Sequence, residues 1–64
     1  MEREPIMQFF KYDHLPENLQ IISRYFCELA EQVHEMLPRN PERSTALRKL
    51  LEAKDAAVRA LIFK

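Results

Sequence analysis

The sequence predicts an all-α protein: a helical hairpin with a short first helix and an extended N-terminal arm, assembled into a helical homo-oligomer. Apolar residues recur at helical spacing through two long stretches, and the four prolines interrupt this pattern where turns are expected. No glycine occurs in the 64 residues, so a glycine-rich phosphate loop is excluded. A chain of this length allows a single domain, residues 1–64, with a small core that partners often complete.

Residues 1–13 are predicted to form the extended arm, because they contain Pro5 and show no helical spacing of apolar residues. Three aromatic side chains follow one another closely in residues 7–12. Two interpretations stay open for Phe10, which either covers the end of the helical hairpin or serves a ligand. Tyr12 stands beside Lys11, and this combination of an aromatic ring and a cation favours a ligand-stacking role.

The first two helices are predicted within residues 16–37. Pro16 suits a first helical turn, and Ser23, inside the helical pattern, is expected to bend the chain and to cap a new segment. The backbone N–H groups at such a restart would suit a phosphate, with Arg24 beside them. The apolar seam recurs at alternating spacings of three and four residues: Leu19, Ile22, Phe26, Leu29, Val33 and Met36.

The last helix is predicted at residues 41–63, after a turn at residues 37–41. Asn40 is a good N-cap, and Pro41 fits the first helical position. The apolar positions of this helix cover roughly 200° of its surface, whereas one core-facing stripe needs little more than about 100°. One neighbouring helix cannot bury so wide an arc, which predicts further copies of the chain. We expect Leu50 and Ala57 at the hairpin contact or at the seam between copies.

Lys54 stands near the middle of that apolar arc. A lysine there must extend to solvent, pair with an acid, or meet an anion that comes from outside. Two arginines are open to two interpretations, because Arg24 with Glu28 and Arg59 with Asp55 also have the spacing of helix-surface ion pairs. The candidate ligand-binding residues, which together suit the phosphates and base of a compact nucleotide, are Lys11, Tyr12, Ser23, Arg24, Lys54 and Arg59.

The charges separate into two halves, although the chain carries ten acidic and ten basic residues and no net charge. Residues 1–37 contain seven acids and three bases, and residues 38–64 contain three acids and seven bases. Opposite net charges of −4 and +4 suit an antiparallel pairing, within one chain or between chains. The zero net charge argues against a long nucleic acid as a partner, because binding of long polyanions depends on bulk electrostatic attraction.

No metal site, cofactor or enzyme activity is expected. Cys27 and His34 share one edge of a helix, but His14 is the one other histidine, and zinc needs three or four ligands. No nucleophile and base stand at a suggestive spacing. A single cysteine favours a reducing interior, the start MEREPIM does not have the pattern of a signal peptide, and no run of about 18 apolar residues is present to span a membrane.

Three segments resemble the hairpin domain of phage anti-CBASS sponges, a domain shared with the anti-Thoeris sponges: FKYDHLPENLQ, SRYFCELAEQVHEMLP and ERSTALRKLLEAKDAAVRA. The resemblance spans residues 9–61. Its most telling parts are the aromatic-x-Tyr start with His-Leu-Pro close by, and the run LRKLLEAKDAAVR. Sponges of this family are small hexameric proteins that sequester cyclic di- and trinucleotide immune signals without cleaving them.

The resemblance implies a non-catalytic protein that binds cyclic dinucleotides in the host cytoplasm and antagonises CBASS-type anti-phage defence, a form of immune evasion. It implies that Tyr12 stacks on a base, that Ser23 and Arg24 hold phosphates, and that the chain forms a hexamer. Binding of cyclic trinucleotides or of ADP-ribose-type signals stays open. The alternative is a structural or adaptor hairpin that oligomerises with a protein partner and binds no nucleotide.

Overall fold

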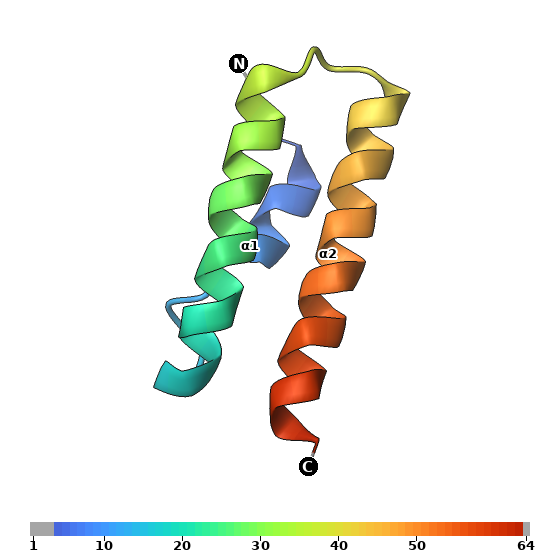
Figure 1. Cartoon of the computed structure of the whole chain (residues 1–64). Coiled ribbons are helices and arrows are strands. Elements are labelled where there is room, and N and C mark those ends of the chain that lie inside the picture. Colours follow the sequence, from blue (N-terminus) through green and yellow to red (C-terminus); the bar gives the residue numbers. More distant parts are fainter. Residues whose placement is uncertain (1–3, 64) are drawn as a thin grey trace.

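Figure 1 shows the computed structural model, which describes residues 4–63 and forms a helical hairpin with a third, short helix against it. The elements follow in the order η1 (Pro5–Phe10), a 3-10 helix, then α1 (Glu17–Met36) and α2 (Pro41–Ile62). α1 and α2 run antiparallel, and η1 lies behind them in this view and packs against both. The described part contains no strand, so the predicted all-α hairpin is confirmed. The assembly of copies stays a prediction.

The turn between α1 and α2 follows from local sequence signals. Leu37 adopts an extended backbone (φ −104°, ψ 144°), as a residue before a proline prefers, and this ends α1. Asn40 caps α2, because its Oδ1 accepts a hydrogen bond of 2.9 Å from the backbone N–H of Arg43. Pro41 takes the first helical position, where no intrahelical N–H is required.

α1 runs without interruption through Ser23, so the expected bend and the separate short first helix are not present. Ser23 has no exposed surface, and its Oγ has no hydrogen-bond partner in the described part of the chain. With Cys27 and Ala30 it forms a strip of small side chains at helical spacing. Ala30 shares a core cluster with η1, and a larger residue on this strip would hold η1 away. Ser23 is therefore a buried residue within an unbroken helix and not the cap of a new segment.

The N-terminal arm is extended only in part. The segment from Pro5 to Phe10 forms η1, which ends where the backbone of Lys11 becomes extended (φ −61°, ψ 144°). A turn follows, in which the backbone N–H of Leu15 donates to the carbonyl of Tyr12 at 3.1 Å. Residues 1–3 of the predicted arm lie outside the described residues.

The core forms where η1 packs against both α1 and α2. Met7 and Phe10, three residues apart, point to the same side of a 3-10 helix. Phe10 is 1% exposed, which makes it a core residue. Two residues of the predicted α1 seam, Leu29 and Met36, are exposed instead, because α1 turns its small-residue strip towards η1. The buried apolar cluster consists of Met7, Phe10, Ala30 and Leu47.

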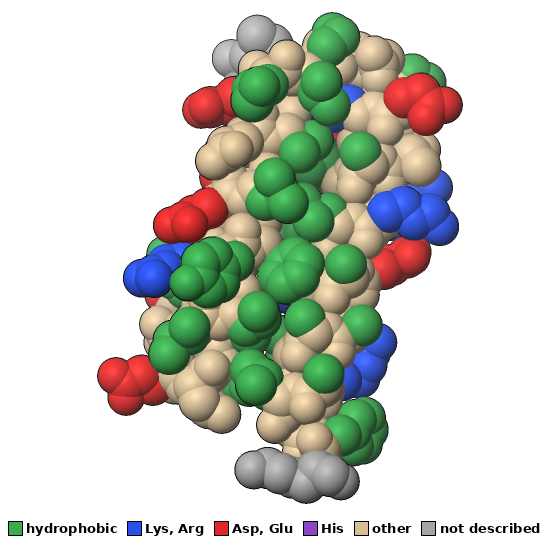
Figure 2. Space-filling view, viewed as in Figure 1, with side chains coloured by type: hydrophobic (Ala, Val, Ile, Leu, Met, Phe, Trp, Pro, Cys, Tyr) green, Lys and Arg blue, Asp and Glu red, His purple; other side chains and the backbone are tan. Residues whose placement is uncertain are grey.

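The hairpin has two unlike faces, which we call the covered face and the bare face. η1 lies on the covered face (Figure 1). At 100° per residue, a second apolar stripe lies away from the residues that meet η1, by roughly 150° on α1 and by roughly 100° on α2. Figure 2 views the molecule from this other side and shows apolar side chains spread over both helices. The bare face consists of Ile21, Tyr25, Leu29 and Met36 of α1 with Ala46, Ala53 and Ala60 of α2.

Candidate functional site

η1 is fixed at the turn end of the hairpin by a buried ion pair. Oε1 of Glu4 lies 3.0 Å from Nη2 of Arg43, and each side chain is 7% exposed. The same oxygen accepts from Nε of Arg43 at 3.4 Å and from the hydroxyl of Ser44 at 3.1 Å. Nη1 of Arg43 donates to the backbone carbonyls of His34 and Leu37. Arg43 thus joins the N-terminal segment, the end of α1 and the start of α2.

The pKa of Glu4 reflects this environment. Burial alone would raise the pKa, because desolvation disfavours the charged carboxylate. Hydrogen bonds from Arg43 and Ser44, together with the positive charges of Arg43 and Arg39, outweigh burial and lower the pKa of Glu4 from its usual 4.5. Glu4 is therefore a carboxylate at neutral pH, and Arg43 neutralises its charge.

Sequence reasoning missed both partners of this ion pair. Arg43 is buried on the same side of α2 as Leu47, four residues later, and this position was the signal that could have singled it out. No local feature of the sequence marks Glu4, because 39 positions separate it from Arg43.

Lys54 is held by partners within the chain. Its Nζ donates to the backbone carbonyl of Phe9 at 2.9 Å and lies 3.5 Å from Oδ1 of Asp55, while its side chain is 11% exposed. Pairing with an acid, one of the three expected possibilities, is therefore present, along with a hydrogen bond to η1. An ammonium has three donors, so one of them can still serve a ligand. The amine borders a cavity of about 420 Å³ that is lined by Gln8, Phe9, His14, Leu51, Lys54 and Asp55.

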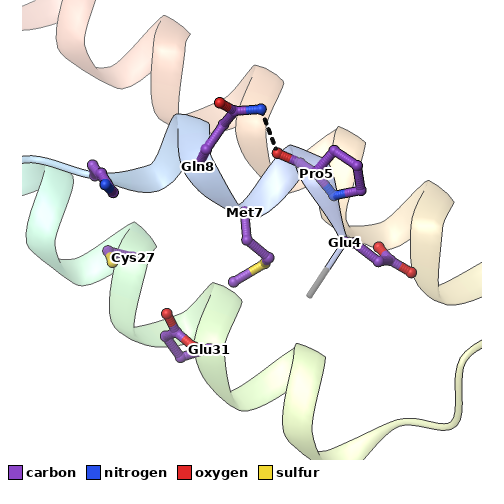
Figure 3. A pocket seen from close by; sticks show the side chains of 7 residues that line it. Glu4, Pro5, Met7, Gln8, Cys27 and Glu31 are labelled. Carbon is purple, nitrogen blue, oxygen red and sulfur yellow. Dashed lines mark hydrogen bonds between the residues drawn. The ribbon is translucent and has the colours of Figure 1, made fainter. Parts of the chain in front are cut away.

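Residues 11–15 lie along α1 in the antiparallel direction. Nε2 of Gln20 donates to the carbonyls of Asp13 and Leu15, at 3.4 and 2.8 Å. Two turns farther along α1, Cys27 lines a second cavity of about 420 Å³ together with Lys11. Figure 3 shows this cavity, between η1 and α1. The segment is therefore hydrogen-bonded near the start of α1, and its first residue, Lys11, lines a cavity beside the middle of this helix.

Tyr12 directly precedes the residues that Gln20 holds, and Ser23 and Arg24 follow Gln20 within the next turn of α1. Tyr12 is half-buried and Arg24 is exposed, but Ser23 has no exposed surface, so its hydroxyl reaches a ligand only if the neighbouring segment moves. Arg24 lies 4.0 Å from Glu28, and both side chains are more than half exposed. Such a surface pair contributes about 0–1 kcal/mol, which leaves Arg24 available to an anion.

Arg59 lies apart from the other candidate residues. It is exposed in the last turn of α2, five residues beyond Lys54, and Asp55, its expected partner, lies near Nζ of Lys54. Lys54 itself meets η1 from the α2 side, whereas the segment with Tyr12 runs along α1. Four candidates therefore belong to the segment next to Gln20 or to the following turn of α1, and we call this set the strip around Tyr12: Lys11, Tyr12, Ser23 and Arg24.

A third cavity lies beside the turn, and sequence reasoning did not anticipate it. It measures about 270 Å³, and its basic groups are Arg39, just before the cap of α2, and Arg48. Ser44, one helical turn before Arg48, lines it as well. The four-residue spacing of Ser44 and Arg48 was an available signal, because it places both on one side of α2.

Within residues 4–63, no three histidine, cysteine, aspartate or glutamate side chains are grouped so that they could hold a metal ion. No helix of that same range combines the length and apolar character needed to cross a membrane. Comparison of the chain with protein-family models, with curated proteins and with solved structures found no match.

Proposed function

We propose that this chain is a non-catalytic binding protein that sequesters cyclic di- and trinucleotide immune signals in the host cytoplasm and so antagonises CBASS-type anti-phage defence. The observation that carries the proposal is the pair of hydrogen bonds from Gln20 to the carbonyls of Asp13 and Leu15, which hold the segment that contains Tyr12 against the first half of α1, the helix that carries Arg24. The sequence resemblance over residues 9–61 supports the same function.

The strip around Tyr12 suits a compact nucleotide. An aromatic ring stacks on the face of a base, and such stacking contributes about 1–3 kcal/mol per base. Lys11 and Arg24, both exposed, offer charge-assisted hydrogen bonds to phosphate oxygens. A cyclic dinucleotide carries bases and phosphates close together, so one aromatic ring with two nearby cations matches it better than it matches a long polyanion.

The bare face supports the proposal that several copies act together. Its large apolar side chains, such as Ile21 and Met36, are exposed in a single copy, and burying apolar surface is favourable by about 25 cal/mol per Å². Symmetric assembly, as a hexamer by resemblance, then builds several pockets from one short chain. In such an assembly Arg59 of one copy can reach a ligand that Tyr12 of another copy holds. Enclosure between copies slows release, which a sequestering protein requires.

Calorimetry with a panel of cyclic di- and trinucleotides, followed by denaturation and chromatography of the nucleotide, tests the proposal. We expect measurable binding and recovery of the intact cyclic nucleotide. Linear product would make the protein an enzyme, and no heat with any nucleotide would favour the adaptor hairpin. Native mass spectrometry of the same samples counts the copies, and a monomer at micromolar concentration would contradict the oligomer.

Substitution of Tyr12 tests the stacking role directly. Tyr12→Ala should weaken binding by about 1–3 kcal/mol, whereas Tyr12→Phe keeps the ring and should retain most of the affinity. Circular dichroism should show unchanged helicity for both variants. If Tyr12→Ala unfolds the protein, the half-buried ring serves the fold and not the ligand.

A further inference from the structure

The cavity beside the turn draws its lining from three parts of the chain. Pro5 and Ile6 come from η1, Arg39 comes from the turn, and Ser44 and Arg48 come from α2. The volume of about 270 Å³ exceeds what a few water molecules need, since one water occupies about 30 Å³ in the liquid. The cavity therefore has room for a small organic molecule.

Glu4, the acid among the described residues that line this cavity, already has hydrogen-bond donors. Oε1 of Glu4 receives hydrogen bonds from Nε and Nη2 of Arg43 and from the hydroxyl of Ser44. Nη1 of Arg43 in turn donates to the backbone carbonyls of His34 and Leu37. The buried ion pair is thus neutral as a unit, and Arg43 is the cation in direct contact with Glu4.

Arg39 and Arg48 carry charges that no acid within residues 4–63 contacts directly. Neither has an ion-pair partner within 4.0 Å among residues 4–63. Arg39 nevertheless faces this corner, since its charge contributes to the lowered pKa of Glu4. Two exposed guanidinium groups from separate elements therefore border one cavity, and the N-terminal end of α2 adds partial positive charge.

The chemistry of these groups identifies a ligand class. A guanidinium presents a planar fork of N–H donors that matches the oxygens of a phosphate. A terminal phosphate carries between about 1.5 and 2 negative charges at neutral pH, which suits two arginines, whereas a carboxylate or a phosphodiester carries only one. Pro5 and Ile6 offer apolar contact to the uncharged part of the molecule.

We propose that this cavity is a second ligand site, separate from the strip around Tyr12, and that Arg39 and Arg48 bind the terminal phosphate of a small phosphorylated molecule there. The ligand differs in chemistry from a cyclic oligonucleotide, which has phosphodiesters and no terminal phosphate. The site is complete within one copy of the chain and so does not depend on assembly.

Calorimetry and amide NMR with inorganic phosphate, glycerol 3-phosphate and glycerol test this site. We expect saturable binding of both phosphates, no binding of glycerol, and shifts of backbone amides centred on Arg39, Ser44 and Arg48. Glycerol 3-phosphate should bind at least as tightly as inorganic phosphate, because the apolar wall accepts its carbon chain. Weaker binding of glycerol 3-phosphate, or no saturation at millimolar concentration, would overturn the proposal.

Variants that each remove one positive charge distinguish binding in this cavity from general electrostatic attraction to a basic surface. Arg39→Gln and Arg48→Gln should each raise the Kd for glycerol 3-phosphate at least about tenfold, since each removes a charge-assisted contact. Lys49→Gln is the control: it removes one charge from the position next to Arg48, and Lys49 lies outside the cavity lining and 3.8 Å from Glu52. We expect a change of about twofold or less for this control. Equal weakening by all three variants would contradict the site.

The same measurements show that the site is separate from the proposed nucleotide strip. Tyr12→Ala should leave the Kd for glycerol 3-phosphate unchanged, and Arg48→Gln should leave the Kd for a cyclic dinucleotide unchanged. Loss of glycerol 3-phosphate binding in a folded Tyr12→Ala variant would merge the two sites and overturn the assignment. Failure of every cyclic nucleotide to bind would leave the phosphate site intact.

Discussion

The covered face and the bare face of the hairpin are built from the same two helices and differ in the presence of η1. On the covered face Phe10 is 1% exposed and Leu47 is fully buried, whereas Met36 on the bare face is 77% exposed. Both faces present apolar side chains at helical spacing, and Figure 2 shows those of the bare face. Apolar spacing alone thus does not decide which side of the hairpin becomes the core; a docked segment of six residues does.

η1 is held at both of its ends and in the middle. Glu4 pairs with Arg43 at the turn end, and Lys54 donates to the carbonyl of Phe9 at the other end. Between them Met7 is buried, as is Phe10 next to Phe9, and full burial of one such side chain contributes about 1.5–3 kcal/mol. That is a large share of the few kcal/mol of net stability that a chain this short retains. We therefore expect changes on the covered face to act on folding and changes on the bare face to act on assembly.

The largest expected effect belongs to Phe10. Phe10→Ala should lower the free energy of unfolding by about 3–5 kcal/mol, because it opens a cavity in the cluster around η1. Phe9→Ala is the matched control: the same substitution one residue earlier, at a side chain that is 57% exposed, should cost less than about 1 kcal/mol. Urea unfolding followed by circular dichroism compares the two. Equal losses would mean that the covered face is not the core.

Arg43 comes next. Arg43→Ala should cost about 3 kcal/mol, because it leaves the buried carboxylate of Glu4 without its partner. Arg48→Ala, on the same helix but at an exposed position, should change stability by about 0.5 kcal/mol or less. A double-mutant cycle with Glu4→Ala measures the coupling, and strictly additive losses would contradict the ion pair.

The pH dependence of stability reports the same ion pair with a smaller effect. The pKa of Glu4 is lowered in the fold, so its contribution to stability is complete above pH 4.5 and is lost as the pH falls through the lowered value. Glu4→Gln should remove this contribution, and the wild-type protein should lose more stability between pH 7 and pH 3 than the variant does. Thermal unfolding of both proteins across that pH range shows which of them loses more stability. A larger loss in Glu4→Gln would reverse the assignment.

The smallest effect on a single copy is expected on the bare face. Ala53→Glu should change the free energy of unfolding of one chain by about 0.5 kcal/mol or less, because the position is exposed and glutamate favours helix. The proposed assembly should dissociate, since the new charge would be buried between copies. Ala56→Glu, at an exposed position outside the bare face, is the control. Analytical ultracentrifugation that shows one mass for all three proteins would remove the bare face from the assembly.

The elements that the sequence predicts well have local signals. Asn40 and Pro41 stand together at the start of α2, and their effect on the backbone depends on no distant residue. Ser23 shows the opposite case. Its local interpretation is a cap, but Ser23 is a buried residue of an unbroken helix, and no local signal marks that burial.

The sequence predicted the candidate site only where the position of a single residue shows that its side chain requires a partner. The sequence shows that Lys54 requires a partner, yet the carbonyl that meets it lies 45 positions away. Arg39 and Arg48 look like ordinary surface arginines until the turn brings both to one cavity. Contacts between distant segments depend on the docked position of η1, and no spacing within a single helix encodes that position.

Nζ of Lys54 is hydrogen-bonded to the end of η1. Chemical labelling of this lysine can therefore report when η1 separates from α2. An amine-reactive reagent modifies a lysine only while its Nζ meets solvent, and Lys49 is exposed whereas Lys54 is buried. Lys54 therefore reacts when the N-terminal segment lifts away, an event whose frequency follows its local free energy of opening. The ratio of labelling at the two lysines, read by mass spectrometry, counts those events in the native chain without any added probe.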